Sequence, residues 1–324
     1  MEMISVFILI GALMTPRVTL AAALSLVLAA SACGGGADDA TASTSSGKKL
    51  KVVATTTQVA DFARNVGGDR IELTQLLKPN VDPHDYEPSP ADIQALATAD
   101  VVVKSGVGLE RWLDQAVSSS GFHGTTVDAS RGVTLRAGNG EEEKGGDPHI
   151  WHNPQNAKIM TKDIATAFET ADPTDRAVFE TNLSAYTGKL DKLDTWIAGQ
   201  IDAIPVADRK LVTNHDAFGY YLDRYRLSFV GSIIPSFDTS AELSARSLTD
   251  LVAKIKQTGV KAIFSESSLP PKTAQAIGRQ AGVKVEAGED SLYGDTLGPQ
   301  GSAGATYLEM ERHNTTVIVT ALKG

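Results

Sequence analysis

The chain has 324 residues, more than one hydrophobic core usually organises, so we expect a body with two lobes. Hydrophobic residues make up 42% of the chain and charged residues 21%, which excludes wholesale disorder and a polytopic membrane protein. Asp and Glu outnumber Lys and Arg by 39 to 30, and this acidic balance argues against nucleic acid as a partner.

The first 32 residues are typical of a secretory signal. Arg17 precedes an apolar run over residues 18–32, which closes on the small residues Ala-Ser-Ala. Met14 is an alternative start of translation, because residues 1–13 add nothing that a signal needs. We therefore expect residues 1–32 to be removed on export.

Cys33, the single cysteine, follows those small residues directly and precedes a segment rich in Gly, Ser and Thr. A lone cysteine excludes an intramolecular disulfide and a thiolate metal cluster. Its surroundings resemble a bacterial lipobox, which implies lipidation of Cys33, although Ala30 stands where leucine is usual. The alternative is a transmembrane anchor, but residues 18–32 are shorter than the ~20 residues that span a bilayer. Composition predicts a flexible tether over residues 33–49.

From residue 50 onward, short runs typical of strands alternate with runs of helical spacing. Strands are expected at 51–55, 71–77, 100–104, 125–128, 210–213, 227–231, 261–265 and 283–285. Helices are expected at 59–66, 90–98, 109–117, 217–224, 245–258, 272–281 and 305–322. The alternation predicts an α/β fold: two similar lobes, residues 50–172 and 205–324, with parallel sheets flanked by helices.

Residues 173–204 between the lobes are expected to form one long helix. Asp172 can cap it, Pro173 suits its first position, and Pro205 ends it. Apolar residues recur at steps of three and four: Phe179, Leu183, Tyr186, Leu190, Leu193, Ile197, Ile201 and Ile204. The helix would be roughly 48 Å long and would limit how far the lobes swing apart. A coiled-coil partner helix is the alternative, but such a stripe in an α/β chain more often packs on its own domain.

Three of the histidines follow the ends of predicted strands or precede a predicted helix. His84 lies beyond the strand that ends near residue 77, and His215 follows strand 210–213 directly. His149 precedes a helix that Asn153 can cap and Pro154 can open. Ligands of parallel sheets collect at the carboxyl ends of the strands, and imidazole is a common ligand of divalent metals. A single such histidine is more often structural, but three at equivalent positions predict a metal site.

These segments resemble a known family, the zinc/manganese solute-binding lipoproteins of bacterial ABC transporters. The resemblance covers residues 50–324. It rests on seven motifs in order: 82–88 (DPHDYEP), 106–113 (GVGLERWL), 147–151 (DPHIW), 214–220 (NHDAFGY), 263–268 (IFSESS), 292–297 (LYGDTL) and 307–314 (YLEMERHN).

The resemblance implies a receptor that grips a divalent metal ion in the cleft between its lobes and delivers it to a membrane permease. Matched motif by motif, His84 and His149 would bind from the first lobe, and His215 and Asp295 from the second. Asp290 is a rival for the fourth position, but its neighbours fit the motif less well. In this family a histidine at the third position is associated with zinc and a carboxylate with manganese. His215 therefore favours Zn²⁺, with Mn²⁺ as the alternative.

Other polar residues are expected to support the site or to be unrelated to it. Glu266 ends a predicted strand that faces the cleft, and we expect it to orient a ligand histidine. His152 is expected to support the site or the start of the next helix rather than to bind as a fifth ligand. His123 is expected in an exposed loop, and His313 is expected to be structural. The acidic run 141–144 lies where zinc-binding members of the family often carry a histidine-rich loop, and we expect a solvated charge run.

We therefore expect a monomeric receptor, lipid-anchored to the outer face of the bacterial cell membrane, with a metal ion and an ABC permease as partners. We do not expect an enzyme, because the sequence carries no His-Glu-x-x-His, Gly-x-Ser-x-Gly or phosphate-loop motif. There are two alternatives. One is a zinc hydrolase with Glu266 as its general base, and the other is a surface adhesin that needs no metal. Histidines must be neutral to bind, so affinity should fall as pH drops through about 6.5.

Overall fold

The computed structural model describes residues 47–138 and 145–323. The predicted signal segment, Cys33, most of the tether and the acidic run 141–144 lie outside the described residues. None of the helices within these two ranges combines the length and the hydropathy that a membrane crossing requires.

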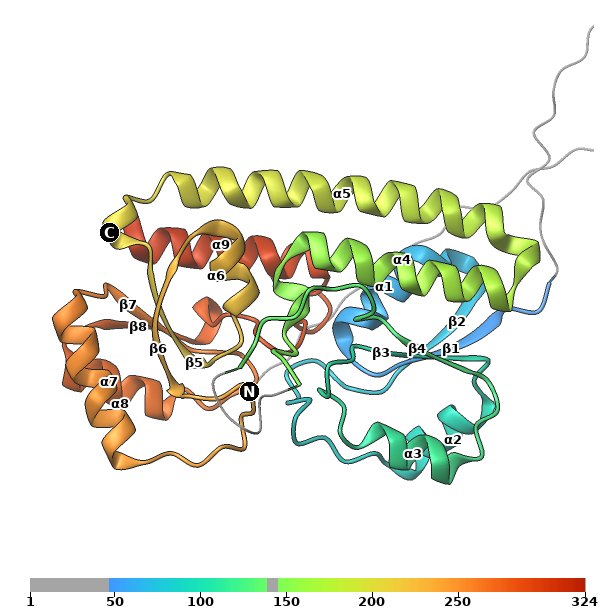
Figure 1. Ribbon diagram of the computed structural model, residues 1–324, viewed down its shortest axis with the longest axis horizontal. Coiled ribbons are helices and arrows are strands. Elements are labelled where there is room, and N and C mark those ends of the chain that lie inside the picture. The colour runs from blue at the N-terminus through green and yellow to red at the C-terminus, as the bar shows by residue number, and fades with distance from the viewer. Residues whose placement is uncertain (1–46, 139–144, 324) are drawn as a thin grey trace, which may run out of the picture. The chain divides into compact units, whose positions relative to one another are not determined.

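The first half is built on a four-stranded parallel sheet with the strand order β2-β1-β3-β4. Its strands are β1 (Leu50–Ala54), β2 (Ile71–Gln75), β3 (Val101–Lys104) and β4 (Thr125–Asp128). Its helices are α1 (Thr57–Gly67), α2 (Pro90–Thr98), α3 (Leu113–Ser120) and α4 (Pro154–Ala171). Figure 1 shows α1 and α4 on one side of this sheet and α2 and α3 on the other.

The alternation of side chains along each strand explains why the sheet is covered on both faces. Val52 of β1 and Val101 of β3 belong to the cluster that contains α1 and α4. Val53 and Val102, one residue further on, pack with α2 and α3 instead. Successive residues of a strand point to opposite faces, and parallel sheets are buried on both, so the adjacent valines of β1 and β3 are all buried.

The predicted helix 109–117 begins later than expected, at Leu113. The reason is Glu110, whose buried carboxylate accepts hydrogen bonds from the main-chain N–H groups of Ser105 and Gly106 and from the Thr55 hydroxyl. These bonds hold a turn in which Gly106 has φ 95° and Val107 has φ 54°, a backbone that cannot continue into a helix.

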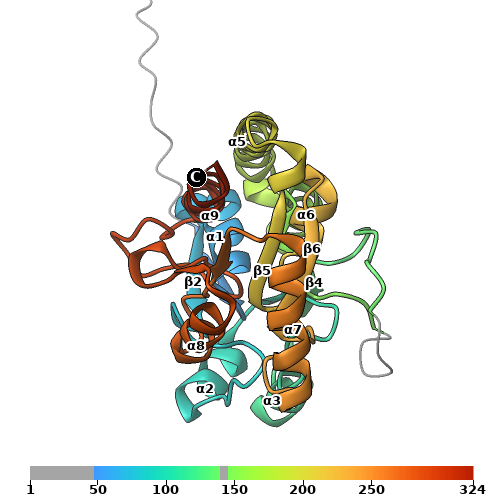
Figure 2. The ribbon, with the colours of Figure 1, turned by 90° about the vertical axis from the view of Figure 1, so that its left-hand side faces the viewer.

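The second half also has parallel strands flanked by helices, as expected, but its strands form two separate pairs. The pairs are β5 (Lys210–His215) with β6 (Ser228–Ile234), and β7 (Ala262–Phe264) with β8 (Lys284–Glu286). The helices are α6 (Gly219–Tyr225), α7 (Ala245–Thr258), α8 (Lys272–Ala281) and α9 (Tyr307–Lys323). Figure 2 views this half from its end, with α7 and α8 beside the strands.

The long helix α5 (Arg176–Asp202) joins the halves. It begins three residues later than predicted, because Pro173–Asp175 form a 3₁₀ turn in which the Asp172 carboxylate accepts from the N–H of Thr174. Its 27 residues correspond to about 40 Å. The predicted stripe faces inward, except that Leu183 is only partly buried.

Helix α5 contacts α1 and α4 of the first half and α6 and α9 of the second. One cluster of buried apolar residues follows it across both halves, from Leu50 to Leu322. The predicted α/β architecture with a linking helix is therefore present, and its two halves share a core.

Candidate metal centre

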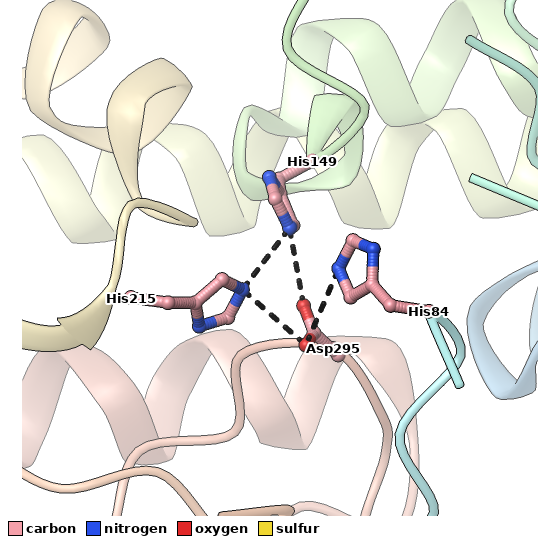
Figure 3. Close-up of side chains that lie close together, drawn as sticks. All are labelled: His84, His149, His215 and Asp295. Carbon is pink, nitrogen blue, oxygen red and sulfur yellow. Dashed lines mark hydrogen bonds and ion pairs between the residues drawn. The ribbon is translucent and has the colours of Figure 1, made fainter. Parts of the chain in front are cut away.

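The structure brings the four predicted ligands together. His84 lies between β2 and α2, His149 directly before the 3₁₀ turn η3 (Ile150–His152), and His215 at the end of β5. Asp295 lies between β8 and α9. One ligand atom of each residue lies within 4.8 Å of those of the others. Figure 3 shows the three imidazoles arranged around the Asp295 carboxylate.

The distances within this group are set by Asp295. Its Oδ1 lies 3.3 Å from His149 Nε2, and its Oδ2 lies 3.3 Å from His215 Nε2 and 3.8 Å from His84 Nε2. The Nε2 atoms of His149 and His215 are 3.2 Å apart. His149, His215 and Asp295 are completely buried, and neither Asp295 oxygen has a hydrogen-bond donor among the described residues. Buried polar atoms that converge without hydrogen bonds of their own fit a cation.

Two carboxylates fix the orientation of two of the imidazoles. Asp147 Oδ1 lies 2.8 Å from His149 Nδ1 and accepts the main-chain N–H of the same histidine. Glu266 Oε2 lies 2.8 Å from His215 Nδ1, and Glu266 Oε1 accepts the His215 main-chain N–H. Both histidines thus present Nε2 to the site, and metal-bound histidines commonly have a carboxylate at the other ring nitrogen in this way.

Electrostatics distinguish His84 from His149. Burial lowers the pKa of His84 to about 4, despite the nearby Asp295. Burial acts in the same direction on His149, but the contacts with Asp147 and Asp295 outweigh it and raise the pKa to about 9. Burial also opposes the charge on Asp295, but His215 and His149 hold the pKa of this carboxyl well below its usual range. In the absence of metal, the Asp295 carboxylate is therefore negative and His149 carries a proton. An incoming cation would displace this proton.

Sequence and structure comparisons identify the family. The model of the family described as "Zinc-uptake complex component A periplasmic" matches residues 52–321. The manganese-binding lipoprotein MntA of Bacillus subtilis is 34% identical over 281 residues, which are 85% of this chain and 90% of that protein. The manganese ABC transporter substrate-binding lipoprotein PsaA of Streptococcus mitis is 32% identical over 280 residues, 84% and 89% of the two chains. The chain belongs to this family.

The comparison of structures agrees. The periplasmic zinc-binding protein TroA of Treponema pallidum superposes with a TM-score of 0.79 at 30% identity, over 86% of this chain and all of that one. The family consists of substrate-binding components of metal ABC transporters. The expectation that the chain is not an enzyme is therefore confirmed, and the hydrolase alternative is set aside.

The other candidates of the sequence are not members of this four-residue group. His152 is buried, with Nδ1 2.9 Å from Glu311 Oε1 and Nε2 2.9 Å from the Gly294 carbonyl, so both of its nitrogens are engaged. Asp290 is exposed in a 3₁₀ turn and is not part of the group. His123 is exposed, and His313 contacts the Ser291 carbonyl.

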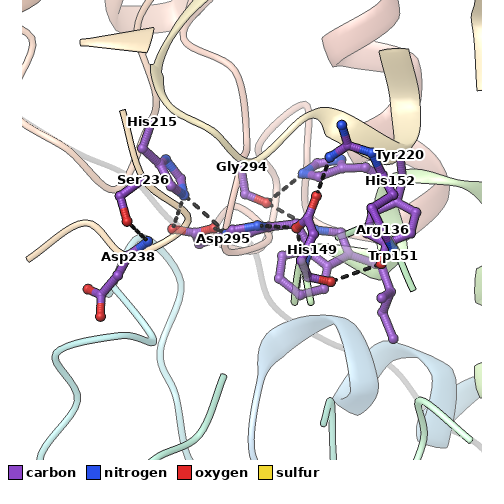
Figure 4. A network of polar contacts seen from close by, with 12 residues as sticks. Arg136, His149, Trp151, His152, His215, Tyr220, Ser236, Asp238, Gly294 and Asp295 are labelled. Atoms are coloured by element: carbon purple, nitrogen blue, oxygen red, sulfur yellow. Dashed lines mark hydrogen bonds and ion pairs between the residues drawn. The ribbon is translucent and has the colours of Figure 1, made fainter. Parts of the chain in front are cut away.

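Arg136 is a functional residue that sequence reasoning missed. Its Nη1 donates to Asp147 at 2.7 Å, on the oxygen that does not face His149, and its Nε donates to Asp223 of α6. The Tyr220 hydroxyl, also from α6, donates to the Asp147 carbonyl at 2.9 Å. Figure 4 shows Arg136 and Tyr220 beside His149. Asp147 stands two residues before His149 in the sequence, but nothing local indicates that Arg136 holds it.

A cavity of about 200 Å³ adjoins the site on the side of His84. Arg111 and Asp238 line it and pair with each other at 2.9 Å. Beside it, the Thr239 hydroxyl donates to Asp82 at 2.6 Å. Both contacts join the two halves, so a relative movement of the halves would change access to His84.

Proposed function

We propose that this protein captures Zn²⁺ with His84, His149, His215 and Asp295 and delivers it to the permease of an ABC importer. The observation that carries the proposal is the buried convergence of three imidazole nitrogens and one carboxylate within 4.8 Å. A four-ligand shell that is complete without water suits sequestration rather than catalysis. The halves are joined by α5, so the ion would be enclosed where their loops meet.

Zinc is favoured over manganese by the donor set. Imidazole nitrogen suits zinc, whereas manganese prefers oxygen ligands, and here three of the four donors are nitrogen. Manganese is the second candidate, because the relatives PsaA and MntA are named for it. TroA, in contrast, is named for zinc.

We also propose that Cys33 is lipidated and anchors a monomeric receptor to the outer face of the cell membrane. Support comes from the resemblance of its surroundings to a lipobox and from relatives that are named lipoproteins. Mass spectrometry of the mature N-terminus checks this proposal. A mature chain that begins elsewhere than Cys33, or a Cys33→Ser protein that stays on the membrane, would contradict it.

Metal identity is tested by the ratio of affinities rather than by zinc affinity alone, because most nitrogen and oxygen sites bind zinc more tightly than manganese. Competition titrations on the wild type and His215→Glu are expected to show a lower preference for zinc in the variant. In cells that lack this receptor, the wild-type gene is expected to restore growth in zinc-depleted medium. Restoration in manganese-depleted medium alone would establish the second candidate.

The fourth ligand is tested by a matched pair of variants. Asp295→Ala is expected to lose zinc binding by at least tenfold, and Asp290→Ala is expected to bind like the wild type, because its side chain is exposed. The reverse result would reject the proposed ligand set.

A further inference from the structure

The segment that carries Asp295 belongs to the second half by sequence but is hydrogen-bonded to the first half. Gln58, buried at the start of α1, donates its side-chain N–H to the Asp295 carbonyl at 2.8 Å. The neighbouring Thr57 hydroxyl accepts the main-chain N–H of Leu297 at 2.7 Å. These residues are more than 200 positions apart in the chain, so the contacts are purely tertiary.

The residues on either side of Asp295 are held in the same way. The Gly294 carbonyl lies 3.0 Å from the indole nitrogen of Trp151, which donates to it, and 2.9 Å from His152 Nε2. The Thr296 hydroxyl accepts the main-chain N–H of Asn80 at 3.0 Å. Figure 4 shows Gly294 and Asp295 between Trp151 and His152 on one side and His215 on the other.

The attachment to the second half ends just before this segment. Leu292 accepts the N–H of Ser267 and donates its own N–H to the carbonyl of Ser265, next to β7. At the far end, the Tyr307 hydroxyl donates to the Trp151 carbonyl at 2.6 Å. Tyr293 is still bonded to Asn314 of α9, through its N–H and its carbonyl, so the change of attachment lies between Tyr293 and Gly294.

We propose that Asp295 moves with the first half, with Gln58, Trp151 and His152 as its positioning residues. The site is then divided three against one: His84, His149 and Asp295 form one rigid set, and His215, oriented by Glu266, is the single ligand on the moving body. This inference rests on the proposed function and refines it. Zinc binds first to the three-ligand set, and closure adds His215; opening at the permease withdraws His215 alone.

The division is tested by asking which ligand couples zinc binding to closure. Spin labels at Ser118→Cys on α3 and Lys254→Cys on α7, both exposed, report the distance between the halves in a Cys33→Ser background. In the chain that is otherwise wild type, zinc is expected to shorten the mean distance between the labels and to narrow its distribution. The same change is expected in Asp295→Ala at saturating zinc. His215→Ala is expected to bind zinc, by calorimetry, without the change in distance.

Each outcome bears on a separate claim. If His215→Ala closes on zinc as the wild type does, Asp295 travels with the second half and the inference is wrong. An absence of any zinc-dependent change in the wild type would likewise overturn it. If the wild type does not bind metal at all, it is the proposed function that fails.

The positioning role is tested by Gln58→Met, which keeps the length of the side chain and removes the donor to Asp295. We expect about a tenfold loss of zinc affinity and a shifted visible spectrum of the Co²⁺-loaded protein, because the carboxylate changes its geometry. The control is Asn182→Leu, which removes a similar amide-to-carbonyl bond between α5 and Val66, far from the site. An unchanged cobalt spectrum and affinity in Gln58→Met would contradict the role.

Discussion

His215 and Glu266 contact each other twice, through the main-chain N–H and through Nδ1 of the histidine, at 3.0 and 2.8 Å. Gly294 makes room for this arrangement, since a Cβ at that position would lie 2.3 Å from Glu266 Oε2. Glycine is therefore required before Asp295 for the Glu266 carboxylate to reach His215 in this arrangement.

Glu266→Gln should weaken zinc binding by 10- to 100-fold, the range typical of a lost partner of a metal-bound histidine. The amide keeps the shape of the side chain but removes the negative charge that lies 2.8 Å from Nδ1 of His215. Competition titration measures the change. The control is Glu289→Gln, an exposed acid in the same half, which should leave the affinity unchanged. Equal affinities for the two variants would show that Glu266 does not orient His215.

Gly294→Ala should also weaken zinc binding by at least tenfold, because the methyl group would displace Glu266 from His215. Gly188 provides the matched control, since a Cβ there meets no atom within 4 Å. Gly188→Ala should leave zinc binding unchanged. It should stabilise the protein by about 0.5–1 kcal/mol, because alanine has a higher helix propensity than glycine and residue 188 lies within α5. Wild-type affinity in Gly294→Ala would mean that Glu266 has room to adjust.

Arg136→Met should destabilise the protein by about 1.5–3 kcal/mol, because the buried Asp147 carboxylate would lose one of its two charged partners and keep only His149. Zinc affinity should fall as well, since Asp147 holds His149. Arg226→Met is the control: its pair with Asp202 is exposed and 3.6 Å apart, so its loss should cost less than about 1 kcal/mol. Urea unfolding of the two metal-free variants measures their losses of stability. Equal losses in Arg136→Met and Arg226→Met would contradict the role of Arg136.

Zinc affinity should rise with pH up to about 9 rather than level off near 6.5, because the pKa of His149 is raised to about 9. Below this pH the metal has to displace the proton, so affinity should fall by up to tenfold per pH unit for each proton released. His84, with a pKa of about 4, contributes no proton at neutral pH. Calorimetry at pH 7 in buffers of different ionisation enthalpy counts the protons. Asp147 is one of the partners that raise the pKa of His149, so Asp147→Asn should shift the pH range in which zinc affinity rises to lower values.

Leu190→Ala in α5 should destabilise the protein by about 2–5 kcal/mol, since Leu190 is completely buried in the core that both halves share. The loss should lower one common melting transition, recorded with probes in each half. Val206→Ala, at a position that is 78% exposed, should change stability by less than about 0.5 kcal/mol. Two separate transitions would show that the halves unfold independently.

Much of the fold is predictable from local patterns. The strands of the first half, α2, α7 and α8 appear where apolar runs, caps and glycines predict them, because hydrophobic periodicity and capping act over a few residues. The late start of α3 was not predictable, because it depends on a carboxylate, Glu110, that accepts from a hydroxyl 55 residues away. The split of the second sheet into two pairs likewise depends on long-range contacts.

The sequence by itself determined the chemistry of the candidate site: three histidines and an aspartate, each in a motif that indicates the family. Only the tertiary structure decided how these groups are supported, since no local pattern indicates the contacts of Arg136, Gln58 and Gly294, and the partner of Gln58 lies 237 positions away in the chain. It also decided that the Asp295 segment is bonded to the first half. The physical reason is that hydrogen bonds form between groups that folding brings together, and these can lie far apart in the sequence. The position of Asp295 in the chain therefore does not indicate which half holds it.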